Sequence, residues 1–221
     1  MKKLNKNVLV IAAHPDDELL GSGGTLKKLI NHGYKVITVI FAKGRKEEED
    51  HIKQAVLKAN KHLGIEEIIF LEYPNLLLET FPLHVINKEI ESLVAKYEPS
   101  MIFTHHYGDI NMDHQILFQA VLTAARPLPG RNPIELLCFE TVSSSEWSQH
   151  TNDKSFKPNY YVDITDTIDI KLESLQFYDV EMRPFPHPRS YKGVQHLAQV
   201  RGMTVGVDHA EAFEIIRRVW K

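Results

Sequence analysis

A histidine and two carboxylates lie together directly after a short apolar segment near the start of the chain. His14, Asp16 and Asp17 follow residues 8–13, which have the composition of a buried strand. Ligands of open α/β sheets bind in the crevice beyond the carboxyl ends of the strands. Ionisable groups gathered there are costly to bury unless an opposite charge pairs with them, and a divalent metal would supply that charge. The segment therefore suggests a metal site.

The same acidic residues allow a simpler interpretation. Asp16, Asp17 and Glu18 would also complement the amino terminus of a following helix, and Pro15 suits a first helical turn. The histidine favours the metal hypothesis, because a metal can use a nitrogen and an oxygen ligand that are offered together.

The glycine-rich segment at residues 21–24 suggests a nucleotide-binding loop as a further interpretation. Its spacing departs from Gly-x-Gly-x-x-Gly, and the acidic residues before it would repel a pyrophosphate. The acidic residue that would bind a ribose about 20 positions later is missing. We therefore expect these glycines to allow close packing of a helix on the sheet.

A second group of metal-competent side chains follows a later apolar segment. Residues 101–104 predict a strand, and a stretch rich in histidine and aspartate, residues 105–114, comes directly after it. A lone His114 would more often be an ordinary core or surface histidine, but two such clusters after two parallel strands can converge on one crevice. His14, Asp17 and His114 would then offer two nitrogens and one carboxylate, with a position left open for water, as catalytic zinc requires.

Apolar segments alternate with segments of helical periodicity, which predicts a parallel sheet with helices on both faces. The expected class is a Rossmann-like three-layer α/β sandwich with a mostly parallel central sheet and the site at the carboxyl ends of the strands. Residues 183–189 carry alternating prolines and are expected to be extended or polyproline-like, and residues 212–219 suit either a strand or a helix. The predicted strands are 8–13, 36–42, 68–71, 101–104, 135–139 and 160–164, and the predicted helices are 25–31, 46–63, 84–97, 113–125, 167–180 and 191–200.

Length and composition limit the classes of protein. A chain of 221 residues that is 43% hydrophobic suits one compact domain over residues 1–221. A net charge of −3 without a polybasic stretch gives no sign of a nucleic acid or an anionic membrane surface as partner. The single cysteine, Cys138, excludes an internal disulfide framework and a cysteine-rich zinc site. The apolar segments are too short for a signal peptide or a membrane span, so we expect a cytoplasmic protein.

A family resemblance is carried by two motifs, Ala13-His14-Pro15-Asp16-Asp17-Glu18 and Asn111-Met112-Asp113-His114. These motifs resemble those of the PIG-L/LmbE-like N-deacetylases, metal-dependent enzymes that remove acetyl groups from N-acetylglucosamine-type amino sugars. Weaker similarity extends into residues 108–111, 123–127 and 187–190. The resemblance implies hydrolysis of the N-acetyl group of a small amino sugar, or of its glycoconjugate or nucleotide-linked form, to acetate and a free amine. The resemblance does not decide whether the protein forms a homo-oligomer.

The resemblance also implies roles for single residues. His14, Asp17 and His114 would bind zinc, although such a set also suits ferrous iron or another divalent ion. Asp16 would be the general base, and Asp113 would lie behind the metal and tune it.

The general acid stays open, because this chain departs from the family pattern. Many relatives have a histidine three residues before the last metal ligand, where this chain has Asn111. An asparagine can donate a hydrogen bond to an oxyanion but cannot deliver a proton. The proton would come from Asp16 or from His105, His106 or His187.

The candidate substrate contacts are weaker predictions, and they comprise Arg45, His105, His106, His187 and Arg189. Arg45 lies in a basic turn that is either solvated or grips sugar hydroxyls or a phosphate with its planar guanidinium group. Arg183 and Arg189 flank the proline segment and could form a rim of the site. The serine-rich residues 140–146 either line the crevice or form a plain loop.

Two other functions stay open. One is a metal-dependent amidase that acts on a different acylated glycoconjugate. The other is a carbohydrate- or nucleotide-binding module without catalysis. The complete set of His14, Asp16, Asp17 and His114 disfavours the binding module. A family member that had lost its catalytic activity would be expected to lack at least one of these residues.

The first prediction concerns metal content. Purified wild-type protein is expected to hold about one equivalent of zinc or iron, and His114→Ala is expected to lose it, because the variant lacks one nitrogen ligand. Elemental analysis of the two tag-free proteins measures this. Wild-type protein that stays metal-free after reloading with zinc would contradict the metal hypothesis.

Overall fold

The computed structural model describes residues 5–45, 47–149, 151 and 153–219. Within these residues the strands form a seven-stranded sheet in the order β3-β2-β1-β4-β5-β7-β6. Strands β1 to β5 run parallel, and β7 runs antiparallel to its neighbours β5 and β6. The mostly parallel sheet is therefore confirmed. The strands are β1 Asn7–Ala12, β2 Lys35–Ala42, β3 Glu67–Tyr73, β4 Met101–His105, β5 Glu135–Phe139, β6 Tyr160–Asp163 and β7 Ala210–Arg217.

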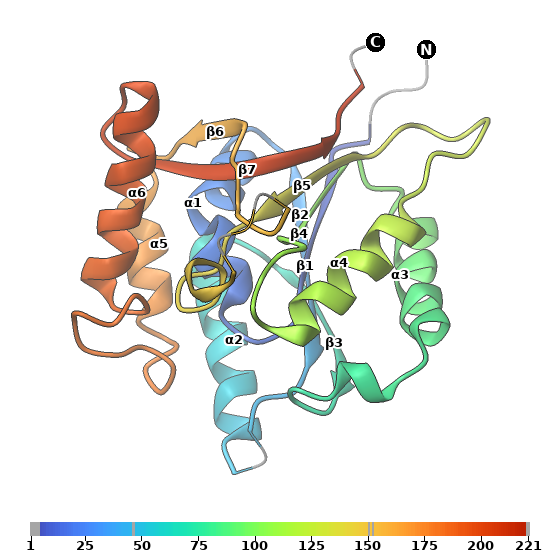
Figure 1. Cartoon of the computed structure of the whole chain (residues 1–221), viewed down its shortest axis with the longest axis horizontal. Helices are drawn as coiled ribbons and strands as arrows, with labels where there is room; N and C mark the ends of the chain where they lie inside the picture. Colours follow the sequence, from blue (N-terminus) through green and yellow to red (C-terminus); the bar gives the residue numbers. More distant parts are fainter. Residues whose placement is uncertain (1–4, 46, 150, 152, 220–221) are drawn as a thin grey trace.

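Helices cover both faces of the sheet. In Figure 1, α3 and α4 lie on one side of the sheet, and α1, α2, α5 and α6 lie on the other. None of the described helices is long and apolar enough to cross a membrane. The helices are α1 Asp17–Asn31, α2 Glu49–Leu63, α3 Leu83–Tyr97, α4 Met112–Ala124, α5 Ile168–Leu175 and α6 Tyr191–Val205, with short 3₁₀ turns at Leu78–Thr80 and Ser145–Trp147.

The position of strand β1 in the sheet explains why residues 8–12 are all apolar. Its residues alternate between the two apolar clusters of the core, with Val8 and Val10 on the face of α1 and α2, and Leu9 and Ile11 on the face of α3 and α4. A strand that is buried on both faces has no polar side. His14 comes two residues after the end of this strand.

The main difference from the sequence prediction is the start of the first helix. Helix α1 begins at Asp17, not at residue 25, so the glycine-rich residues 21–24 lie inside it and form no nucleotide-binding loop. A Cβ atom on Gly21 would lie 2.2 Å from the ring of Phe139. One on Gly24 would lie 2.9 Å from Ile164. The glycines thus allow close packing of α1 on the sheet, as expected from the sequence.

Smaller differences occur in the second half of the chain. The ambiguous residues 212–219 belong mainly to strand β7, and α5 ends earlier and α6 later than predicted. The proline segment is not extended, because it folds back on itself: the Arg183 amide donates to the Arg189 carbonyl at 2.9 Å, and the His187 amide to the Pro184 carbonyl at 3.1 Å. The predicted start of the second helix, Lys46, lies outside the described residues.

The order of the strands creates the crevice. The chain runs from β1 through β2 to β3 on one side, and then returns to place β4 on the other side of β1. Connections that leave two adjacent parallel strands in opposite directions open a crevice at their carboxyl ends. The two motifs that follow β1 and β4 therefore face each other.

A buried ion pair ties the end of the chain to helix α1. Lys171 of α5 lies 2.7 Å from Glu211 of β7, and each side chain is 4% exposed. The Lys171 ammonium also donates to the Leu20 carbonyl at 2.8 Å. Glu211 accepts the amides of Gly24 at 2.9 Å and Thr25 at 2.7 Å. The pair thus holds the middle of the helix that begins at the crevice.

The second prediction tests this pair. Lys171→Met is expected to lower the free energy of unfolding by about 3–5 kcal/mol, because it leaves the Glu211 carboxylate buried without its cation. Urea denaturation of wild type and variant measures the change. The control is Lys28→Met in α1, which removes a partly exposed ammonium that pairs with Asp166 and is expected to cost less than about 1 kcal/mol. Equal losses in both variants would contradict the assigned role.

Candidate metal centre

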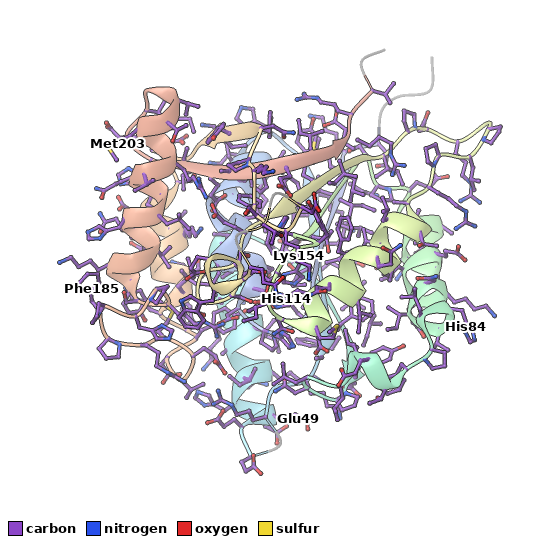
Figure 2. The ribbon with its side chains drawn as sticks, viewed as in Figure 1. Glu49, His84, His114, Lys154, Phe185 and Met203 are labelled. Atoms are coloured by element: carbon purple, nitrogen blue, oxygen red, sulfur yellow. The ribbon has the colours of Figure 1, made fainter. Side chains whose placement is uncertain are left out.

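Three side chains from the two motifs converge at the end of the sheet. His14 follows β1, Asp17 opens α1, and His114 lies in the first turn of α4, where Figure 2 labels it. One ligand atom from each residue lies within 4.8 Å of the others. The residues that the sequence predicted as metal ligands are thus brought together.

The distances between the three donor atoms suit a metal. His14 Nδ1 lies 3.3 Å from His114 Nε2 and 3.3 Å from Asp17 Oδ2. His114 Nε2 lies 3.2 Å from Asp17 Oδ2. A tetrahedral site with ligand bonds of about 2.0–2.1 Å has edges of roughly 3.3 Å. Two imidazole nitrogens and one carboxylate oxygen at these spacings match one face of such a site.

Each histidine ligand is oriented by a carboxylate behind it. His14 Nε2 lies 2.9 Å from Asp113 Oδ2, and the other oxygen of Asp113 accepts the Leu78 amide at 3.0 Å. His114 Nδ1 lies 3.2 Å from Asp109 Oδ1. These contacts turn His14 Nδ1 and His114 Nε2 toward the candidate metal position, as carboxylates behind metal-binding histidines commonly do.

Asp109 was assigned no role from the sequence. It is fully buried and accepts hydrogen bonds from the hydroxyls of Ser144 and Ser145 and, at 2.9 Å, from the Asn111 amide. The carboxylate thus fixes the serine-rich segment after β5 as well as the His114 ring. The only sequence signal for Asp109 is its place in the histidine- and aspartate-rich segment between β4 and α4. Its serine partners follow β5 and are distant in the chain, so the sequence alone does not reveal them.

The electrostatics of the cluster call for a positive charge. Burial alone would raise the pKa of Asp17, but the nearby His114 and His105 rings outweigh burial and hold it well below its ordinary value. Burial opposes protonation of His114, yet Asp17 and Asp109 raise its pKa to about 10. The carboxylates thus draw a proton onto His114. A divalent cation among the same donor atoms would meet that demand.

Asp16 lies beside the three candidate ligands and is not one of them. It caps the start of α1 with a φ of 91°, a backbone conformation that is uncommon outside glycine. Its side chain is 1% exposed, and Oδ2 accepts a hydrogen bond from Arg189 Nη1 at 3.1 Å. Burial raises the pKa of Asp16 well above its ordinary value, although the Arg189 charge opposes the shift.

A cleft of about 660 Å³ opens beside the cluster. Its wall combines the candidate ligands with Asp16 and with polar groups from four other segments of the chain. These polar groups include Arg45 after β2, Asn111 before α4, Ser143 after β5, and Glu181 and Arg189 near the proline segment.

His105 and His106 do not line this cleft. The fully buried His105 ring accepts the Ala13 amide at 2.9 Å and stacks on His114 at 3.7 Å between ring centroids, behind the candidate ligands. His106 points elsewhere, with Nδ1 2.7 Å from Glu214 and Nε2 2.8 Å from the Lys154 carbonyl. These placements argue against substrate contact by either ring.

His187 also lies outside the cleft lining. Its Nδ1 accepts the Arg189 amide at 3.0 Å, and its ring makes a T-shaped contact with Trp147 at 5.7 Å between centroids. Its contact with the backbone of Arg189 makes it a support of the rim.

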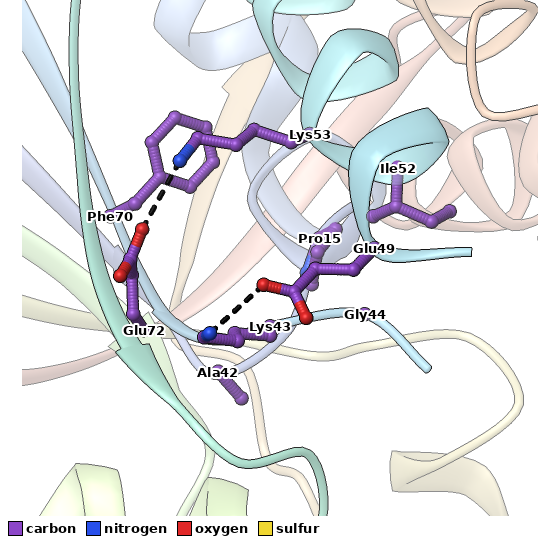
Figure 3. A pocket seen from close by; sticks show the side chains of 9 residues that line it. All are labelled: Pro15, Ala42, Lys43, Gly44, Glu49, Ile52, Lys53, Phe70 and Glu72. Carbon is purple, nitrogen blue, oxygen red and sulfur yellow. Dashed lines mark hydrogen bonds and ion pairs between the residues drawn. The ribbon is translucent and has the colours of Figure 1, made fainter. Parts of the chain in front are cut away.

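A smaller pocket of about 310 Å³ adjoins the cleft and shares Pro15, Gly44 and Ile52 with it. Figure 3 shows its two lysines already paired, Lys43 with Glu49 and Lys53 with Glu72. The side chains drawn there include no histidine and no unpaired carboxylate, so the candidate chemistry lies in the larger cleft.

Comparisons with known proteins identify a matching family and several relatives. Residues 9–125, more than half of the chain, match the family model PIG-L, described as GlcNAc-PI de-N-acetylase. A probable N-acetyl-alpha-D-glucosaminyl L-malate deacetylase 2 of Bacillus cereus is 28% identical over 141 residues, which cover 57% of this chain and 64%, less than two thirds, of that relative. The diacetylchitobiose deacetylase of Thermococcus kodakarensis is 26% identical over 191 residues, which cover 79% of this chain and 69% of the relative.

A solved structure confirms the fold class. The N,N'-diacetylchitobiose deacetylase from Pyrococcus horikoshii superposes with a TM-score of 0.78 at 23% sequence identity, and the match covers 96% of this chain and 84% of that one. At this identity the likeness establishes the fold.

The third prediction concerns the carboxylate behind His14. Asp113→Ala is expected to weaken zinc binding by about 10–100-fold, because the His14 ring loses the partner that orients it. Competition with a chromophoric chelator measures the dissociation constant. Gln119→Ala, at an exposed position of the same helix, is the control and is expected to bind zinc like wild type. Unchanged binding in Asp113→Ala would contradict the orienting role.

Proposed function

The chain belongs to the PIG-L family, and from this membership we propose that it is a zinc-dependent hydrolase of N-acetylglucosamine-type amino sugars or their conjugates. It would hydrolyse the N-acetyl group and release acetate and the free amine. The observation that carries the proposal is the triangle of His14, Asp17 and His114 donor atoms beside the buried Asp16. Relatives named as deacetylases of GlcNAc-containing sugars support the substrate class.

His14, Asp17 and His114 would hold the zinc ion. Bound zinc acts as a Lewis acid on a carbonyl oxygen and lowers the pKa of water toward ~7. Asp113 and Asp109 keep the two imidazoles in the orientation that binding requires.

Asp16 would take the proton from the attacking water. A general base works best when its pKa lies near the working pH, and burial moves the pKa of Asp16 in that direction. The hydrogen bond from Arg189 fixes one carboxylate oxygen and leaves the other for the proton.

The arrangement also points to Asp16 as the group that returns the proton to the leaving amine. His105 and His106 lie behind the site or away from it, and His187 is outside the cleft lining. Asn111 cannot deliver a proton. Its Oδ1 caps α4 by accepting the Asp113 amide at 2.9 Å, so the Nδ2 group remains as a donor for the oxyanion.

The fourth prediction separates the base from the metal ligands. Asp16→Asn is expected to keep a full equivalent of zinc and to lose about 10²–10⁴-fold in kcat, the usual contribution of a general base. Acetate release from N,N'-diacetylchitobiose and elemental analysis of the same samples measure both quantities.

Asp50→Asn, an exposed carboxylate in α2, is the matched control and is expected to keep wild-type activity. Loss of zinc from Asp16→Asn would contradict the assignment of Asp16, and wild-type turnover by that variant would contradict its role as base.

A further inference from the structure

One carboxylate in the cleft lies between two guanidinium groups. Glu181 Oε2 is 3.3 Å from Arg189 Nη1 and 4.0 Å from Arg45 Nη2. Arg45 comes from the segment after β2, Glu181 lies just before the proline segment, and Arg189 is the last residue of that segment. All three residues line the same cleft as the candidate metal ligands.

Both arginines already have partners among the residues of the protein. Arg189 donates from Nη1 to Asp16 at 3.1 Å and from Nε to the Ser143 hydroxyl at 3.1 Å. Arg45 Nη1 also lies 3.4 Å from Glu48. The side chains of Glu181 and Arg189 are 16% and 22% exposed, so their pairing is sheltered from water. Neither guanidinium group is left as a free cation.

This charge pattern disfavours an anion on the substrate. The charges of Arg45 and Arg189 are balanced by Glu181 and Asp16, so a phosphate or carboxylate would have to displace one of these carboxylates or lie beside it. Like charges placed together in a partly desolvated site are a usual means of rejecting a ligand.

A sugar hydroxyl suits the same three side chains. A hydroxyl group can accept a hydrogen bond from a guanidinium and donate one to a carboxylate at the same time. Glu181 supplies the carboxylate acceptor, and the adjacent Arg45 and Arg189 supply the guanidinium donors.

We infer that Glu181 makes this cleft select an uncharged amino-sugar glycoside over one with an anionic group on the aglycone. The inference rests on the proposed deacetylase function and names its substrate class. Of the two partners expected for Arg45, it favours sugar hydroxyls over a phosphate, since Glu181 and Glu48 already engage that guanidinium.

The test compares two substrates in wild type and Glu181→Gln. N,N'-diacetylchitobiose is uncharged, and N-acetylglucosaminyl malate carries carboxylates on its aglycone. Wild type is expected to have the higher kcat/KM for the uncharged sugar. Glu181→Gln is expected to reduce that preference by about 10-fold, the effect of one unit charge at a few ångströms in a half-sheltered site. Most of the change is expected in KM for the malate conjugate.

Glu89→Gln is the matched control. It removes an exposed carboxylate of α3 that does not line the cleft, and it is expected to leave the substrate ratio unchanged. Thermal unfolding of all three zinc-loaded proteins checks that the variants are folded.

Calorimetric titration of the same two ligands gives the selectivity without turnover. Absence of acetate release by wild type overturns the proposed function, whereas the binding ratio still tests the inference. Tighter binding of the malate conjugate by wild type overturns the inference. An unchanged ratio in Glu181→Gln, or no binding of either ligand, overturns it as well.

Discussion

The structure depends on how it accommodates several buried carboxylates at the carboxyl ends of β1 and β4. Asp16, Asp17, Glu18, Asp109 and Asp113 are all at most 1% exposed. Burying a carboxylate is costly unless hydrogen bonds or opposite charges compensate. These carboxylates have different partners. Asp113 lies beside His14 Nε2, and Asp109 lies beside His114 Nδ1. Asp16 pairs with Arg189. Asp17 lies among three imidazole rings at the candidate metal position.

Glu18 illustrates the cost of burial for a carboxylate that has no ion-pair partner among the described residues. It bonds to the Asn60 amide at 2.9 Å and the Tyr178 hydroxyl at 2.6 Å. Burial still raises its pKa to about 7, even though these two bonds lower it. Asp17, its neighbour in sequence, has a pKa held well below the ordinary value. Two adjacent carboxylates thus differ because one faces the histidines and the other faces the interior of the fold.

The sequence predicted the candidate ligands because two local motifs, each at the end of a predicted parallel strand, were enough. The partners could not be predicted, because they come from distant segments: Ser144 for Asp109, Arg189 for Asp16, and Glu211 for the middle of α1. The same limit explains the error at the start of α1, whose glycines are required by the side chains of Phe139 and Ile164. The sequence pattern does not separate His105 from His106, whereas in the structure successive side chains of an extended chain point to opposite sides.

The distribution of roles along the chain suggests how selectivity and chemistry are linked. The family match ends at residue 125, and it contains every candidate metal ligand. Glu181 and Arg189 come from the later part, yet Arg189 donates from the same Nη1 atom to Glu181 and to Asp16. If Glu181 loses its charge, Arg189 interacts less with Glu181, and its interaction with the Asp16 carboxylate changes as a result. A substitution in the later segment that changes the charge of the substrate subsite therefore also changes the environment of Asp16, the proposed general base. Arg189 couples the two parts of the chain.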